Sequence, residues 1–69
     1  MKIFASRLKE LRQEKGKKQT EMAEFLEITP RAYQYYEGAG HYPDVPGLIK
    51  LADFFGVSTD YLLGRSDQR

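Results

Sequence analysis

Cysteine is absent from the 69-residue chain, which excludes disulfide bonds and a thiolate nucleophile. This absence fits a reducing compartment. Long apolar runs are absent too, because the N-terminal stretch MKIFA is far too short for a signal peptide or a membrane-spanning helix. We therefore expect a cytoplasmic protein without a membrane segment.

An excess of charge of one sign is also missing, because 11 Lys and Arg stand against 10 Asp and Glu. The overall charge of +1 gives no argument for a nucleic-acid partner. The distribution is uneven, however: residues 1–18 carry seven cations and two anions, whereas residues 19–37 carry one cation and four anions. The basic N-terminal part suits a local phosphate-binding surface and equally suits solvated helix faces, so both interpretations stay open.

Groups for catalysis or metal binding are scarce. The chain has one histidine and no pair of carboxylates that the spacing brings together. His41 and Asp44 are close in sequence, but two loop ligands without two further partners do not form a metal site. We expect no enzymatic activity, no metal, no cofactor and no small-molecule ligand.

The apolar residues that are present recur at helical spacing, and no segment shows the alternation of a strand. Phe4, Leu8 and Leu11 predict a first helix over residues 4–15. A second helix of about two turns begins near Gln19 and is too short to persist without tertiary packing. In a small chain without disulfides, helix packing or dimerisation must supply the stability.

Capping residues mark where the other helices begin. Thr29 can accept a hydrogen bond from the first turn, and Pro30 lacks an amide that would be unpaired there, so a third helix begins at Pro30. The same reasoning predicts two more helices, with caps at Asp44 and Ser58 and ends at Gly56 and Gly64. The sequence thus predicts an all-α fold, a compact five-helix bundle over residues 1–64, with a frayed tail at residues 65–69.

The second and third predicted helices are separated by residues 27–29 and match a helix-turn-helix, in which the second helix of the pair lies in the major groove of DNA. If Ala32, Tyr33 and Tyr36 face the core, the third helix presents four other residues outward. These candidate base-contacting residues are Pro30, Arg31, Gln34 and Tyr35. An arginine can bind guanine, and a glutamine adenine, through paired hydrogen bonds, although solvated surface is the alternative for both.

Two of these positions have further interpretations. Gln19 opens the second helix, where unpaired backbone amides favour a phosphate and the side-chain amide adds a donor, although it is otherwise an ordinary first-turn residue. Tyr35 can contact a phosphate or a thymine methyl, and it can equally serve a protein interface.

Six segments carry a further signal when they are taken in order: RLKELR at residues 7–12, QTEMA at 19–23, YE at 36–37, Pro43, LIKLA at 48–52 and GVSTDYLLG at 56–64. This ordered set resembles the phage-repressor, Cro-like or XRE-type helix-turn-helix family. The resemblance implies a five-helix, lambda-repressor-like DNA-binding fold, operator recognition by the third helix (about residues 30–37) and frequent binding as a dimer. It also implies that Gln19 and positions 30, 31, 34 and 35 lie where family members commonly touch DNA.

The chain departs from the family pattern at several positions. Lys17 and Lys18 replace an apolar residue and a Ser or Thr cap, so a core contact and a cap are lost while phosphate-binding charge is gained. Glu27 replaces a glycine, which costs about 1 kcal/mol if the turn keeps a positive φ. Tyr33 replaces a Val or Ile, and its hydroxyl needs a partner or solvent. His41 stands where basic residues often reach the DNA backbone, and it completes the predicted phosphate contacts: Lys17, Lys18, Gln19 and His41.

These observations predict a small transcriptional regulator, expected to be a repressor, that binds double-stranded DNA at an inverted-repeat operator. The alternative is a protein-interaction module of the same fold, with a contact surface formed by Tyr35, His41 and Tyr42. Three apolar residues lie outside the predicted core-facing sides of the helices: Ile49, Phe54 and Leu63. They suit a contact between two copies in a homodimer and equally suit burial inside the domain.

Overall fold

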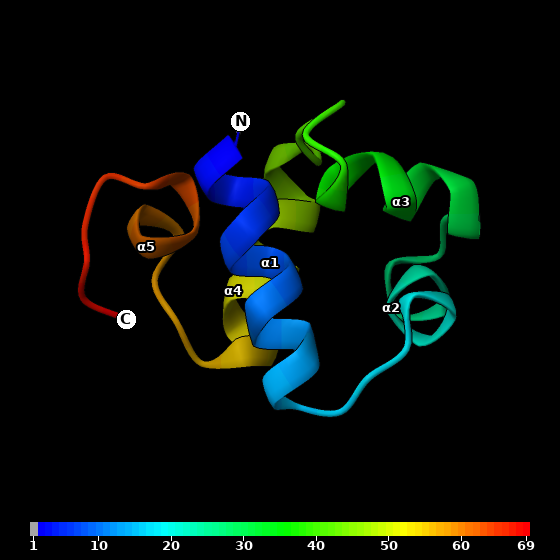
Figure 1. Cartoon of the computed structure of the whole chain (residues 1–69), viewed down its shortest axis with the longest axis horizontal. Coiled ribbons are helices and arrows are strands. Elements are labelled where there is room, and N and C mark those ends of the chain that lie inside the picture. Colours follow the sequence, from blue (N-terminus) through cyan, green and yellow to red (C-terminus); the bar gives the residue numbers. More distant parts are fainter. Residues whose placement is uncertain (1) are drawn as a thin grey trace.

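Five helices make up the regular structure of the chain, for which the computed structural model describes residues 2–69. They are α1 (Lys2–Glu14), α2 (Gln19–Leu26), α3 (Pro30–Glu37), α4 (Val45–Phe55) and α5 (Thr59–Leu63). Figure 1 shows α1 in the centre with α4 behind it, α2 and α3 on one side and α5 on the other. Residues 2–69 contain no strand, and the predicted all-α, five-helix architecture is confirmed.

The core is formed by apolar side chains from all five helices. Leu8 of α1, Tyr33 of α3, Leu51 of α4 and Leu62 of α5 have no exposed surface, and Met22 of α2 is 1% exposed. Each such side chain contributes roughly 1.5–3 kcal/mol through its removal from water. Because Tyr33 enters this core, the opposite face of α3 must point to solvent.

The predicted N-terminal caps of the last three helices are confirmed. Thr29 Oγ1 accepts from the Ala32 amide at 3.1 Å, and the equivalent bonds at Asp44 and Ser58 measure 2.9 Å. These bonds involve residues three apart in sequence, which explains why sequence alone could place them. The first helix differs from the prediction, since it begins at residue 2 instead of 4 and ends at residue 14 instead of 15.

The start of α2 confirms the loss of a side-chain cap. Lys18 occupies the capping position without a side-chain hydrogen bond to the helix, because an ammonium group has no acceptor. Its backbone amide donates instead to the Glu21 carboxylate at 2.8 Å, which is the half of a capping box that a lysine still permits. The backbone amides of the first turn of α2 therefore receive no capping side chain from Lys18.

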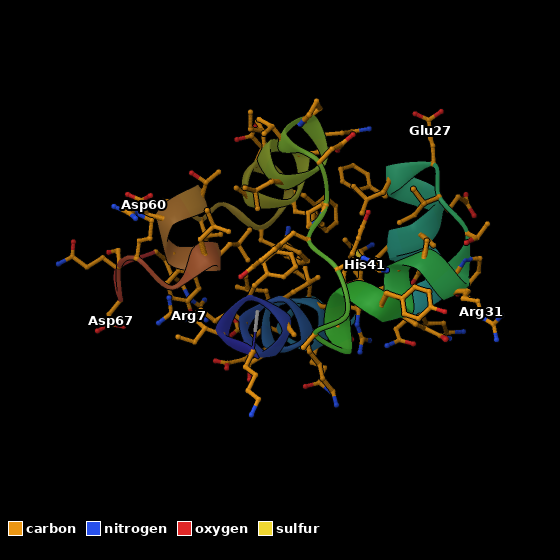
Figure 2. The ribbon with its side chains drawn as sticks, turned by 90° about the horizontal axis from the view of Figure 1, so that it is seen from above. Arg7, Glu27, Arg31, His41, Asp60 and Asp67 are labelled. Carbon is orange, nitrogen blue, oxygen red and sulfur yellow. The ribbon has the colours of Figure 1, made fainter. Side chains whose placement is uncertain are left out.

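The predicted fraying of residues 65–69 is wrong, because this tail is bonded back onto α1. Arg7 of α1 pairs with Asp67 at 2.9 Å, and Figure 2 shows Arg7 reaching toward the segment that carries Asp67. Arg69 places two guanidinium nitrogens on the two carboxylate oxygens of Glu14, at 2.9 and 2.6 Å. The partners are more than 50 residues apart in sequence, so no local pattern could have revealed these bonds.

The turn between α2 and α3 yields a prediction about stability. Glu27 has φ 59°, in the left-handed region, and its side chain points into solvent at the edge of the molecule (Figure 2). Glu27→Gly should stabilise the domain by about 1 kcal/mol, because glycine adopts this conformation without the Cβ clash. In thermal unfolding the midpoint should rise by about 4–8 °C.

The control is Glu27→Gln, which removes the charge and keeps the Cβ atom. It should leave the midpoint nearly unchanged. An equal rise in both variants would mean that the carboxylate, and not the backbone, is the source of the cost.

Candidate nucleic-acid interface

The outward face of α3 presents the residues that the sequence placed there. The Arg31 side chain points away from the body of the molecule in Figure 2, and Tyr35 is 46% exposed. Pro30 and Gln34 are also exposed. The four candidate base-contacting residues therefore share one solvent-facing side of a helix whose other side is buried through Tyr33.

A single carboxylate fixes α3 against α1 and α2. Glu37 Oε2 accepts from Arg12 Nε at 2.7 Å and from the Tyr33 hydroxyl at 2.5 Å. Glu37 Oε1 accepts from Arg12 Nη2 at 3.1 Å and from Gln19 Nε2 at 3.0 Å. We name Arg12, Gln19, Tyr33 and Glu37 the Glu37 cluster. Because its members come from three helices, it sets the orientation of α3 relative to the start of α2.

Burial makes the Glu37 cluster electrostatically strong. The side chains of Arg12 and Glu37 are 13% and 3% exposed. Burial raises the pKa of Glu37, but hydrogen bonds from Arg12, Tyr33 and Gln19 outweigh it, and the pKa lies below its ordinary value. Burial and the neighbouring carboxylate raise the pKa of Tyr33, which keeps its hydroxyl protonated as a donor. The partner that the Tyr33 hydroxyl needs is therefore Glu37.

The sequence analysis did not foresee the roles of Arg12 and Glu37. One signal was present: Glu37 follows Tyr33 by four residues, so it lies on the same inward face of α3. A carboxylate on a buried helix face requires a partner. The identity of that partner depended on how α1 crosses α3, which spacing does not give.

Arg12 also holds the loop that carries two predicted phosphate contacts. Its Nη1 donates to the Lys17 carbonyl at 2.8 Å, immediately before Lys18 and the first turn of α2. One of the two side-chain N–H donors of Gln19 is bonded to Glu37, which fixes the amide at the start of α2. A phosphate at this helix end would meet backbone amides, lysine ammonium groups and the second N–H of Gln19.

The fourth predicted phosphate contact, His41, is fixed beside α3. The backbone amides of Gly40 and His41 both donate to the Tyr35 carbonyl, at 2.8 and 3.4 Å. The His41 ring meets the Tyr35 ring edge-on, with 5.3 Å between centroids. In Figure 1 this loop rises above α3, whereas the loop before α2 lies at the lower edge. The predicted phosphate contacts thus lie on two sides of the α2–α3 pair.

Other kinds of site find little support in the described residues. Within residues 2–69, no three His, Cys, Asp or Glu side chains gather where they could hold a metal ion. Asp44, considered with His41 as a metal ligand, instead caps α4. None of the five helices combines the length and apolar character needed to cross a membrane.

Comparison with known proteins decides the family. The model of a helix-turn-helix family matches residues 8–62, a range that contains α2, α3 and the turn between them. The chain belongs to this helix-turn-helix family. The XRE-type resemblance inferred from the ordered segments is thereby confirmed.

This helix-turn-helix chain is similar to several regulators of Bacillus subtilis. The SPbeta prophage-derived uncharacterized HTH-type transcriptional regulator YonR is 48% identical over 61 residues, covering 88% of this chain and 56% of YonR. The HTH-type transcriptional regulator ImmR is 46% identical over 64 residues, covering 93% and 50%. The chain thus spans about half the length of these relatives.

A solved structure gives the same result for the helix-turn-helix fold. A transcriptional regulator from Listeria innocua superimposes with a TM-score of 0.84 at 39% sequence identity. The match covers 88% of this chain and 57% of the other. The arrangement of α1–α5 is therefore one that a known regulator also uses.

Proposed function

We propose that residues 1–64 form a sequence-specific domain for double-stranded DNA, with α3 in the major groove. The observation that carries this proposal is the solvent-facing row on α3, where Arg31 and Gln34 lie on the side opposite the buried Tyr33. These two side chains offer the donor patterns that pair with guanine and adenine edges. Pro30 and Tyr35 complete the row that would face the bases.

The phosphate contacts in this proposal come from Lys17, Lys18 and Gln19 at the start of α2 and from His41 after α3. They flank α3 on two sides and would fix its register on the duplex. The similar proteins are named transcriptional regulators, which supports regulation as the outcome of binding, and repression is the outcome that we propose. The role is binding without catalysis, and the DNA would be met in the cytoplasm.

We further propose that two copies bind an inverted-repeat operator, with their α3 helices one DNA turn, about 34 Å, apart. Of the three apolar residues considered for a dimer contact, Ile49 is 48% exposed. Phe54 packs on Phe25 with ring centroids 4.7 Å apart, and Leu63 packs against the core. The exposed face of α4 around Ile49 is therefore the part that supports a contact between copies.

The experiment is selection of bound duplexes from a randomised library by the purified chain, at two salt concentrations. Enrichment of an inverted repeat is expected, and its spacing would give the separation of the two α3 helices. Enrichment of a single half-site would support specific binding and contradict the proposed dimer. Absence of binding even at low salt would overturn DNA recognition in favour of the protein-interaction module.

A further inference from the structure

A groove of about 410 Å³ lies between α2 and α4, beside the loop that precedes α2. Two aromatic rings meet in it, because Phe25 of α2 packs on Phe54 of α4 with 4.7 Å between the ring centroids. Phe25 remains 36% exposed. No residue of α3 lines this groove, which we name the Phe25 groove: its lining residues are Lys17, Glu21, Met22, Glu24, Phe25 and Phe54. The Phe25 groove is therefore separate from the row of α3 that would face the bases.

The two sides of the Phe25 groove carry charges of opposite sign. The α2 side is acidic, because it carries Glu21 and Glu24. The other side is basic: the ammonium groups of Lys15, just after α1, and Lys50 of α4 each lie over one of the two rings, 4.8 and 5.2 Å from its centroid. None of the four ion pairs found in residues 2–69 uses any of these four groups. Their charges therefore remain open to a partner.

This pattern of charge is complementary to itself. When two copies meet about a two-fold axis, the same surface of each copy forms the contact. If the axis passes through the Phe25 groove, the acidic α2 side of one copy faces the basic α4 side of the other. The partly exposed Phe25 rings then leave water at the centre of the contact, which is favourable. A partner of one sign, by contrast, would meet like charges along one of the two sides.

We propose that the Phe25 groove is a self-association surface for a second copy of this chain. It differs from the face of α4 around Ile49, because consecutive helix residues point about 100° apart and Lys50 is the one that reaches Phe25. The apolar centre is small, so the contact should be weak, with a dissociation constant of about 0.1–1 mM. Neighbouring sites on one duplex would strengthen it by raising the local concentration, and only this consequence rests on the proposed function.

The test is sedimentation equilibrium of the purified chain without DNA, at concentrations up to about 2 mM. Wild type should dimerise reversibly. Glu24→Lys and Lys50→Glu should each weaken dimerisation about 10-fold or more, because the symmetry applies every substitution twice. An equimolar mixture of the two variants should dimerise again. One variant then carries only cations at these two positions and the other only anions, so every charge meets its opposite.

The control variants match these substitutions in charge. Glu10→Lys and Lys9→Glu change the net charge by the same amounts at exposed positions of α1, outside the Phe25 groove. Both should leave dimerisation unchanged. Ile49→Ser should also leave it unchanged, because it alters the other face of α4. Thermal unfolding of each variant shows whether the fold is kept.

The outcomes separate the Phe25 groove from the DNA-binding function. The proposal would be overturned by a wild type that stays monomeric throughout, by a mixture of the two variants that stays monomeric, or by dimerisation that only Ile49→Ser abolishes. None of these results involves DNA, so specific DNA binding would stand. Conversely, the expected pattern of dimerisation in a chain that selects no duplex would support the Phe25 groove and overturn the proposed function alone.

Discussion

Replacing Glu37 by glutamine is expected to destabilise the domain by about 1–3 kcal/mol, the cost of leaving charged hydrogen-bonding partners unsatisfied in a partly buried site. Glutamine keeps the size of the side chain but leaves the partly buried Arg12 guanidinium without a counter-charge. Its amide group would also meet donors from Arg12, Gln19 and Tyr33 where two carboxylate oxygens now accept them. The whole stability expected for a chain of this size is roughly 3–10 kcal/mol, so the variant should lose a large fraction of it, and its urea midpoint should fall clearly.

The matched control lies in the same chain. Glu14 and Arg69 form an ion pair of the same type and similar distances, but their side chains are 46% and 44% exposed. Glu14→Gln should leave the urea midpoint nearly unchanged, because water screens an exposed pair and solvates either partner alone. Equal losses in the two variants would show that burial does not determine the strength of these pairs.

The depressed pKa of Glu37 also gives the stability a defined pH dependence. Its contribution is complete above the ordinary carboxyl value of 4.5 and is lost as the pH falls through the lower folded value. Tyr33→Phe keeps the ring in the core and removes one of the donors that lower this pKa. Urea unfolding at a series of acidic pH values should therefore show the loss of stability at higher pH in Tyr33→Phe than in wild type. Identical acid profiles would contradict a role for the hydroxyl.

Arg31→Ala is expected to have the largest effect on DNA recognition. Loss of a bidentate contact to guanine should weaken binding to the selected operator by about 5- to 150-fold, with a much smaller change on unrelated duplexes. Selection with the variant should enrich a sequence in which one base pair of each half-site no longer shows a base preference. Because Arg31 is exposed and points away from the core, the fold should be unaffected, and thermal unfolding provides that check.

Lys18→Ala is the contrasting variant. It should weaken binding to every sequence by a similar factor, because a phosphate contact carries no base preference. If Arg31→Ala behaved in the same way, α3 would have to lie on the duplex in another orientation. Gln34→Ala gives an independent check, with relaxation expected at a different base pair.

The elements that sequence predicted correctly depend on neighbours in the chain. Thr29, Asp44 and Ser58 each cap a helix through an amide three residues ahead, and Glu27 shows the positive φ expected for a position where glycine is usual. Such features require only backbone geometry within one turn. They sufficed to place the starts of three helices. The outward face of α3 could also be predicted, because burial of Tyr33 fixes how the helix is rotated about its axis.

The features that sequence missed depend on how distant segments meet. Arg12 pairs with Glu37 across 25 residues, and Arg69 with Glu14 across 55. Several other cations and carboxylates of the chain could have formed such pairs equally well on spacing alone. Gln19 illustrates the result for the site: its position was predicted correctly, but the use of its side chain by Glu37 was not.

The Glu37 cluster also restricts how this domain can evolve. A lineage that replaces Arg12 first leaves the Glu37 carboxylate without its counter-charge, and one that replaces Glu37 first leaves a partly buried guanidinium without its own, so each single step passes through a less stable intermediate. Simultaneous replacement by apolar residues avoids both, which makes the two positions strongly non-additive. The exposed side chains of α3 face no such barrier. Binding preference can therefore change one residue at a time on a scaffold whose internal ion pair resists single substitutions.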